Sequence, residues 1–202
     1  MINITKCTNG IFLKSSTMDF IQRPLYINSC YDNGIFATSS SVVNINADAV
    51  TGATYGTSMY SYNTPTSVLA NKSSTIESLR DAKIVDTTYG IMIVSNSNAL
   101  IQDNIINGKA GITSSGTTIS AILSQSAYVQ AFDNSITGFG NLTGGTGSAR
   151  YRASLQGVLI VESPTAQTQV STGFDNSGTI AVDTFRGSTG PDRYFAGDPI
   201  DP

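Results

Sequence analysis

The chain has no histidine, no tryptophan and only two cysteines among its 202 residues. The absence of histidine removes Ser-His-Asp and Cys-His nucleophile schemes, histidine metal sites and the usual general base near neutral pH. Two cysteines are too few for a disulfide scaffold or a four-cysteine zinc site, and the sequence has no dense acidic calcium loop. We therefore expect no metal and no cofactor, and any chemistry must use Asp, Glu, Tyr, Lys or Arg.

Charge is also scarce, since only 12% of the residues are charged and the net charge is −3. The eleven Lys and Arg residues are scattered along the chain. Without a basic cluster, we expect no nucleic-acid partner. No apolar run is long enough to span a bilayer, and residues 1–15 lack the features of a signal peptide, so we expect neither membrane insertion nor Sec export.

The chain is instead rich in hydroxyl and amide side chains, because Ser, Thr and Asn make up about a third of it. It also contains a near repeat: the sequence SNSNALIQDNIING at 95–108 returns as SQSAYVQAFDNSITG at 124–138. Self-similarity at a period of roughly 20–30 residues is typical of stacked structural units. The repeat therefore predicts a solenoid within one domain.

Glycines divide the chain into intervals of similar length. They are Gly10, Gly34, Gly56, Gly90, Gly111 and Gly138, at spacings of 24, 22, 34, 21 and 27 residues. Between them, alternating patterns predict strands at 42–46, 99–102 and 127–130. Residues 75–85 carry apolar side chains at helix-like spacing, so we expect a short helix there, as an excursion that lengthens the 34-residue interval.

Two pairs of residues occupy matching places in successive units. Asn104 and Asn134 match in the near repeat, and stacked amides can hydrogen-bond along the axis, so they predict an asparagine ladder. Cys7 and Cys30 each precede an Asn-Gly-Ile-Phe sequence. We expect both thiols to pack in one interior stack, and their disulfide state stays open because it depends on local geometry.

This pattern of Gly-Ile, a polar stretch and then Ser-Asn-Ala-Leu-Ile-Gln-Asp-Asn-Ile-Ile-Asn-Gly resembles the coils of right-handed parallel β-helix proteins, the pectate-lyase-like superfamily. The resemblance covers residues 2–140. It implies an all-β solenoid of about five to six coils, followed by a short β-rich tail. We divide the chain into coils at 1–140, a Gly-rich connection at 141–148 and a capping or oligomerisation segment at 149–202.

Within that superfamily the chain is most similar to bacteriophage tailspike and tail-fibre adhesins. The resemblance implies a homotrimer in the virion tail, extracellular when mature, that contacts other tail proteins and binds bacterial surface polysaccharide, which such proteins often also cleave. Tailspikes are usually several hundred residues long. We therefore expect this chain to be a segment of a longer protein or a subunit that stacks on another β-helix.

Cleavage of a glycan by hydrolysis would require paired carboxyl groups. Asp103 and Asp133 align in adjacent repeats, at an expected spacing of about 5 Å that suits a retaining hydrolase. Glu77 and Asp81 form a second candidate pair, because they would share a face of the expected helix. In both cases a structural reading is open: Asp-Asn is a typical turn sequence, and Glu77 and Asp81 could face solvent beside Arg80.

Exposed tyrosines suit carbohydrate binding, because the ring offers a flat surface and the hydroxyl a hydrogen-bonding tip. The candidates are Tyr60, Tyr62 and Tyr89, of which the first two share one strand face. Packing between chains is the alternative role. The sequence thus leaves three functions open: a polysaccharide-binding adhesin, a glycan-cleaving lyase or hydrolase, and a structural subunit of a virion or assembly.

Overall fold

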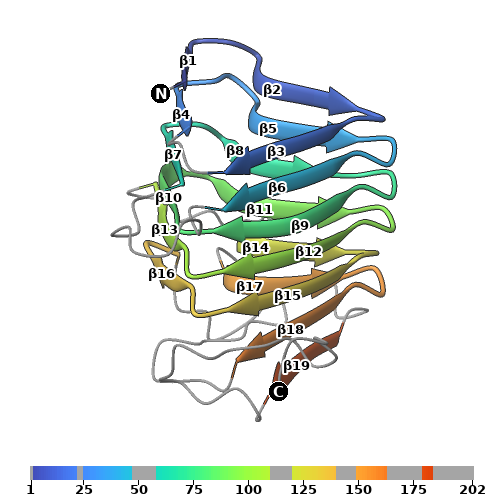
Figure 1. Cartoon of the computed structure of the whole chain (residues 1–202). Coiled ribbons are helices and arrows are strands. Elements are labelled where there is room, and N and C mark those ends of the chain that lie inside the picture. The colour runs from blue at the N-terminus through green and yellow to red at the C-terminus, as the bar shows by residue number, and fades with distance from the viewer. Residues whose placement is uncertain are drawn as a thin grey trace, which may run out of the picture.

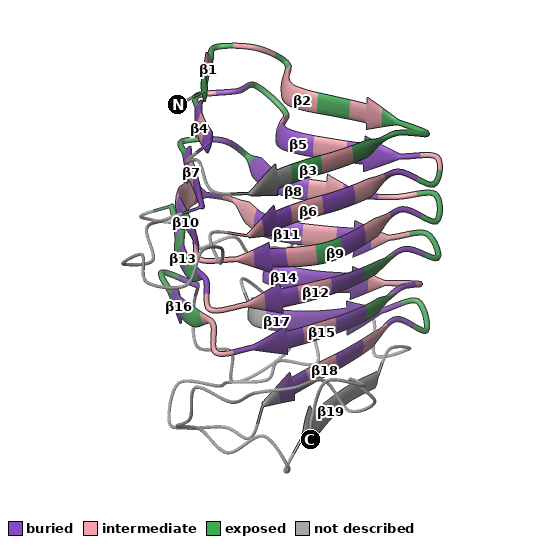
Figure 2. Ribbon diagram, viewed as in Figure 1, coloured by how far each residue is buried: buried purple, intermediate pink, exposed green. Residues whose placement is uncertain are grey.

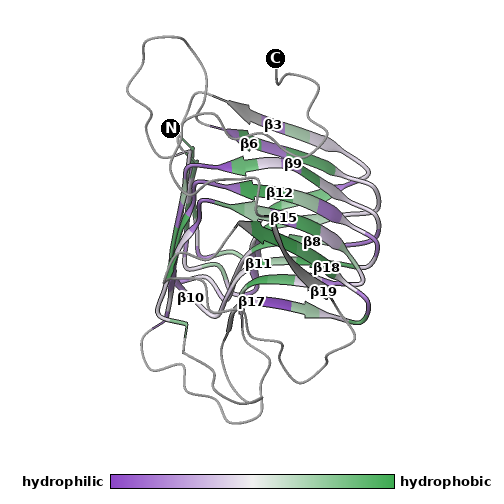
Figure 3. Ribbon diagram, turned by 90° about the horizontal axis from the view of Figure 1, so that it is seen from below, coloured by the Kyte–Doolittle hydropathy of each residue, from purple (hydrophilic) through white to green (hydrophobic). Residues whose placement is uncertain are grey.

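The computed structural model describes residues 2–21, 25–46, 58–109, 120–139, 149–162 and 179–183 (Figure 1). Every regular element in these ranges is a strand, and all strand pairs are parallel. The strands form three sheets, named here sheets A, B and C (Figure 3). Sheet A contains β1(Ile2–Thr5), β4(Leu25–Asn28), β7(Met59–Tyr62), β10(Ala82–Thr87), β13(Ile105–Gly108) and β16(Ser135–Thr137). Sheet B contains β2(Asn9–Lys14), β5(Asn33–Thr38), β8(Thr66–Ala70), β11(Tyr89–Val94), β14(Ser120–Gln125) and β17(Ala149–Ser154). Sheet C contains β3(Thr17–Ile21), β6(Val42–Asn46), β9(Thr75–Arg80), β12(Asn98–Gln102), β15(Tyr128–Phe132), β18(Val158–Glu162) and β19(Thr179–Asp183).

Successive strands belong in turn to sheets A, B and C, so the chain winds around one interior. Three strands make one coil, and the described strands build six coils, with β19 added to sheet C. From β1 to β15, each strand pairs with the strand three places later, and in β12 and β15 this aligns Asn98 with Tyr128. The predicted all-β fold and parallel β-helix organisation are confirmed.

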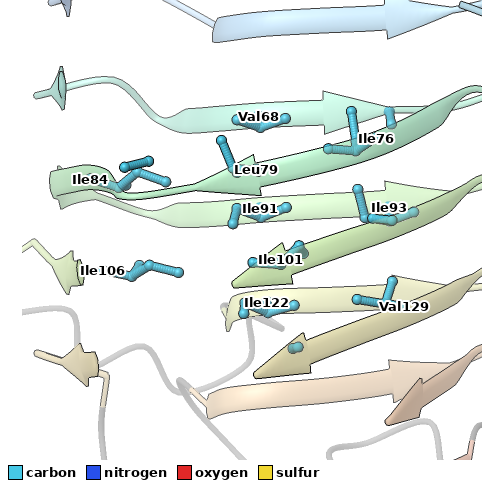
Figure 4. Close-up of a cluster of buried hydrophobic side chains, with 14 of the residues drawn as sticks. Val68, Ile76, Leu79, Ile84, Ile91, Ile93, Ile101, Ile106, Ile122 and Val129 are labelled. Atoms are coloured by element: carbon cyan, nitrogen blue, oxygen red, sulfur yellow. The ribbon is translucent and has the colours of Figure 1, made fainter. Parts of the chain in front are cut away.

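The interior is built from side chains at alternate positions of each strand, as the alternating burial in Figure 2 shows. On sheet A, Ile84, Ile106 and Ile136 lie one above another, and on sheet B, Ile91 and Ile122 do the same. All five are buried. Figure 4 shows such ranks from the three sheets meeting in one apolar stack. Each column of aligned, buried side chains fixes the register of its sheet. A slip of one residue would turn the apolar side chains of a strand out of the core.

Three of the predicted marker glycines hold equivalent places at the start of sheet B strands, namely Gly10, Gly34 and Gly90. A Cβ on Gly90 would lie 2.5 Å from the carbonyl oxygen of Ala121 and 2.8 Å from Cγ2 of Ile106. These strands therefore pass too close to the next coil for a side chain at that point.

The predicted helix at 75–85 is wrong, because β9 and β10 occupy this segment and turn at Asp81. Register irregularities where β9 pairs with β6 and with β12 leave Ile76 and Leu79 both buried at a spacing of three. A bulged strand thus reproduced the apolar spacing of a helix.

The 34-residue interval between Gly56 and Gly90 is therefore not explained by a helical excursion. Ser67 lies between Thr66 and Val68, which pair with Asn33 and Ile35, so a serine replaces the marker glycine in the third coil. Gly56, Gly111 and the connection at 141–148 lie outside the described residues. Beyond that connection, β17 and β18 continue sheets B and C as the sixth coil.

Replacing Gly90 by Ala should lower the free energy of unfolding by about 1–3 kcal/mol, because the new methyl group overpacks against the Ala121 carbonyl. Urea denaturation measures this. Ala121→Gly is the control, since position 121 is the equivalent place in the next coil and already holds a Cβ. Gly90→Ala stability equal to that of the unchanged protein would contradict the close approach.

Candidate functional site

The surface features of this solenoid are set by its corners, named here A–B, B–C and C–A after the sheets they join. Non-glycine residues with positive φ occur at all three, for example Ser29 (55°) at A–B, Ser126 (47°) at B–C and Asp103 (55°) at C–A. Left-handed backbone is uncommon for such residues, and Asn, Asp and Gly tolerate it best. The many polar turn residues of the sequence therefore lie where the chain changes sheet.

The C–A corner carries the predicted asparagine ladder, which is confirmed. Asn104 Nδ2 donates to Asn134 Oδ1 at 2.9 Å and to the Leu79 carbonyl at 2.9 Å, and the Ala82 N–H donates to Asn104 Oδ1 at 2.9 Å. Asn134 Nδ2 donates in turn to the carbonyl of Ile101. Asn104 is 1% exposed, so its amide connects three coils from within.

The predicted catalytic aspartates lie beside this ladder. Asp81, Asp103 and Asp133 occupy the same C–A corner in three consecutive coils, with φ of 55°, 55° and 54°. The Arg80 guanidinium lies 3.0 Å from the Asp103 carboxylate and 3.9 Å from that of Asp81. Asp103 and Asp133 are thus adjacent, as the repeat predicts, and they also serve as turn residues. Their role in catalysis stays a prediction.

Glu77 belongs to a different surface from the corner aspartates. It is an exposed residue within β9, whereas Asp81 follows the end of that strand. The two therefore share no helix face, and the reason for pairing them is lost.

The B–C corner is supported from inside by buried serines. The Ser41 N–H donates to Ser74 Oγ at 3.2 Å, and the Ser74 N–H donates to Ser97 Oγ at 3.1 Å. All three side chains are at most 1% exposed. This serine ladder ends where the fifth coil has Ala127 in place of a serine.

A groove of about 360 Å³ begins at Ser97, the last serine of the ladder. It runs along the B–C corner of the fourth, fifth and sixth coils. The groove is lined by Asn96, Ser97, Asn98, Ser126, Ala127, Tyr128, Leu155 and Gln156. The backbone holds these coils in register, since the Tyr128 N–H donates to the Ser97 carbonyl at 3.0 Å and the Val158 N–H to the Ala127 carbonyl at 2.7 Å.

The lining of this corner groove combines one aromatic ring with amides. Tyr128 is 44% exposed and lies beside Asn98, its partner in the strand register. Asn96 and Gln156 add amide groups, and Leu155, 47% exposed, adds an apolar rim. The lining contains no charged side chain. Its volume is within the range of small-molecule sites, so the groove can accept a ligand with both hydroxyl groups and an apolar face.

The predicted tyrosines lie on two other faces. Tyr60 and Tyr62 both belong to β7 of sheet A, and Tyr62 is 52% exposed. The ring of Tyr60 stacks on that of Tyr26 in the neighbouring coil, with centroids 4.8 Å apart and an interplanar angle of 6°. One ring face of Tyr60 is therefore covered.

Tyr89 begins β11 of sheet B. It interacts with Arg152 of β17, whose pKa is lowered by burial, while the interaction with Tyr89 partly offsets that effect. Tyr89 thus lies apart from the two sheet A tyrosines, and the three predicted residues do not form one site.

Two kinds of feature are absent from the ranges that the structure describes. No cluster of three or more His, Cys, Asp or Glu side chains suitable for a metal ion occurs there. The same ranges hold no helix with the length and apolar character needed to cross a bilayer.

No protein-family model, no curated protein and no solved structure matches this chain.

Sequence reasoning missed the groove residues Asn98, Tyr128 and Gln156. The first two occur in the near repeat, and aligning its copies would have placed them side by side. Gln156 belongs to the sixth coil, and no recognisable copy of the repeat places it beside Ser126.

Replacing Asn104 by Ala should lower the free energy of unfolding by about 2–4 kcal/mol, because the buried Ala82 N–H and Leu79 carbonyl would each lose a partner. Urea denaturation measures the change. Asn107→Ala is the control, since Asn107 is exposed on the adjoining strand and should change stability by no more than about 0.5 kcal/mol. Equal effects of the two substitutions would show that the ladder is not a principal support.

Proposed function

We propose that this chain is the right-handed β-helix segment of a bacteriophage tailspike or tail fibre, and that it binds bacterial surface polysaccharide in the corner groove. The observation that carries the proposal is the exposed Tyr128 ring beside Asn98 in an uncharged groove. A sugar ring presents an apolar face to such an aromatic side chain and hydroxyl groups to neighbouring amides. Because the lining lacks charge, neutral sugars suit it better than uronic acids.

The groove is also placed well for a polymer. Its residues come from three coils, which extend about 10 Å along the axis at the usual strand spacing. Asn96 and Gln156 stand at corners of different coils, so they can contact different parts of a chain that runs along the solenoid. Recognition by a rigid, parallel-stranded corner needs little ordering of the protein, which favours affinity.

The proposal includes a homotrimer joined to other tail proteins in the virion. The outer side of sheet B supports self-association, because Phe12, Phe36, Leu69 and Met92 align across four coils. Phe12 is 55% exposed and makes an edge contact with Phe36, with ring centroids 5.3 Å apart. Burying this apolar rank against another copy would remove it from water.

A second candidate function is a structural assembly subunit that stacks end to end with another β-helix. The first coil favours it, because β1, β2 and β3 each pair on one side only. The core-facing Ile4 and Leu13 of that coil are only half-buried. Open strand edges over an incompletely covered core are suited to strand addition.

Binding to a panel of capsular and O-antigen polysaccharides tests the proposed function. Tyr128→Ala should weaken binding about tenfold, equivalent to about 1.4 kcal/mol, because the aromatic platform is lost. Tyr31→Ala is the matched control, since Tyr31 is 69% exposed and lies at the A–B corner, far from the groove lining.

The outcomes separate the three functions. Binding that Tyr128→Ala weakens and Tyr31→Ala leaves unchanged, without new reducing ends or unsaturated uronate, supports the adhesin. Product release that Asp103→Asn or Asp133→Asn abolishes would support the enzyme instead. No binding to any polysaccharide, together with persistent end-to-end assembly, would contradict the adhesin and support the structural subunit.

A further inference from the structure

The two cysteines meet at the A–B corner, one coil apart. Cys7 lies between β1 and β2, and Cys30 lies between β4 and β5. Their sulfur atoms are 3.0 Å apart. The Tyr31 N–H donates to the Cys7 carbonyl at 2.7 Å, so the two corners are held in register by the backbone as well.

The spacing of the coils suits a covalent bond between these thiols. Neighbouring parallel strands lie about 4.8 Å apart, which falls within the range of about 4.4–6.8 Å that separates Cα atoms in disulfides. The next residue in the stack is Thr64, whose Oγ1 accepts a hydrogen bond from the Cys30 N–H at 3.4 Å. Cys30 therefore has a fixed hydroxyl neighbour on one side and a thiol on the other.

We propose that Cys7 and Cys30 form a disulfide that fastens the first coil to the second. The first coil lies at one end of the stack. Its three strands pair on one side only, and its described side chains are exposed or half-buried. Local opening is favoured where burial is low, and a covalent link to the second coil would oppose opening of this coil.

The two thiols differ in solvent exposure, and this difference decides which of them reacts first. Cys7 is half-buried, whereas Cys30 is 3% exposed, and burial, assisted by its contact with Cys7, raises the pKa of Cys30 to about 11. Cys7 is therefore the thiol that an external oxidant reaches first, because attack requires an accessible thiolate.

With oxidised glutathione as the oxidant, the exchange has two steps. The Cys7 thiolate attacks one glutathione sulfur, forming a mixed disulfide and releasing one glutathione thiolate. The Cys30 thiol then gives its proton to water or buffer and attacks the Cys7 sulfur, which releases the second glutathione. Two protein thiols are oxidised to one disulfide, and one glutathione disulfide is reduced to two glutathione molecules.

Folding should strongly favour this bond. The cysteines are 23 residues apart, and joining them in an unfolded chain requires closing that loop. The chain-entropy relation for a loop of this size predicts a native disulfide roughly 300-fold more favoured than the same bond in the unfolded chain. The fold has already brought the sulfurs together.

The test is the thiol–disulfide equilibrium of the unmodified chain in glutathione buffers, with and without denaturing urea. Iodoacetamide quenching followed by intact mass and peptide mapping measures the fraction joined between Cys7 and Cys30. We expect the equilibrium constant to be roughly 300-fold larger in the folded protein. A matched control is the double variant Cys7→Thr with Thr8→Cys, which keeps the composition but moves the thiol to an exposed neighbour, and should lose most of this preference.

Each other outcome would overturn the proposal. These outcomes are a folded-state equilibrium constant less than about tenfold above that in urea, a stable glutathione adduct on Cys7 with Cys30 still free, or equal pairing in the control variant. None of these readouts involves glycan binding, so failure here leaves the proposed function untouched.

Discussion

The structure depends on a repeated corner constraint: each coil must turn between sheets and still present its next strand in register with the coil below. At the C–A corner, Asn104 and Asn134 meet this constraint with side-chain amides that replace missing backbone partners. At the B–C corner, buried Ser74 and Ser97 do the same with hydroxyl groups. Because a buried amide or hydroxyl without a partner is costly, these ladders make the register specific as well as stable.

The same constraint decides where a ligand can bind. Asn and Ser side chains that point inward at a corner form the ladder hydrogen bonds. A ligand can therefore be contacted only by the side chains that point outward. At the C–A corner, Arg80 pairs with Asp103 of the next coil, so both of these charged side chains are already engaged. At the B–C corner, the serine ladder stops at Ala127, and Tyr128 beside it flanks the groove. The proposed binding site is therefore a consequence of how the stack is built.

Sequence reasoning succeeded where a pattern repeats locally. The strand at 42–46 and the pairing of Asn104 with Asn134 follow from alternation and from the near repeat. It failed where the repeat is broken. Ser67 replaces a marker glycine, and a bulge brings Ile76 and Leu79 to helix-like spacing. The near repeat aligns Asn98 with Tyr128, but the whole groove could not be assembled from sequence, because Leu155 and Gln156 of the sixth coil are not recognisable copies of the corner residues before them.

In a stacked parallel solenoid, backbone hydrogen bonds at the corners join residues of neighbouring coils. Scalar couplings across hydrogen bonds, measured by NMR on isotope-labelled protein, test this directly. The account predicts couplings from the Ser135 N–H to the Asn104 carbonyl and from the Asn98 N–H to the Ser74 carbonyl, which the structure places at 2.8 Å and 3.1 Å. Couplings that instead join residues across short hairpins would contradict a stacked parallel solenoid.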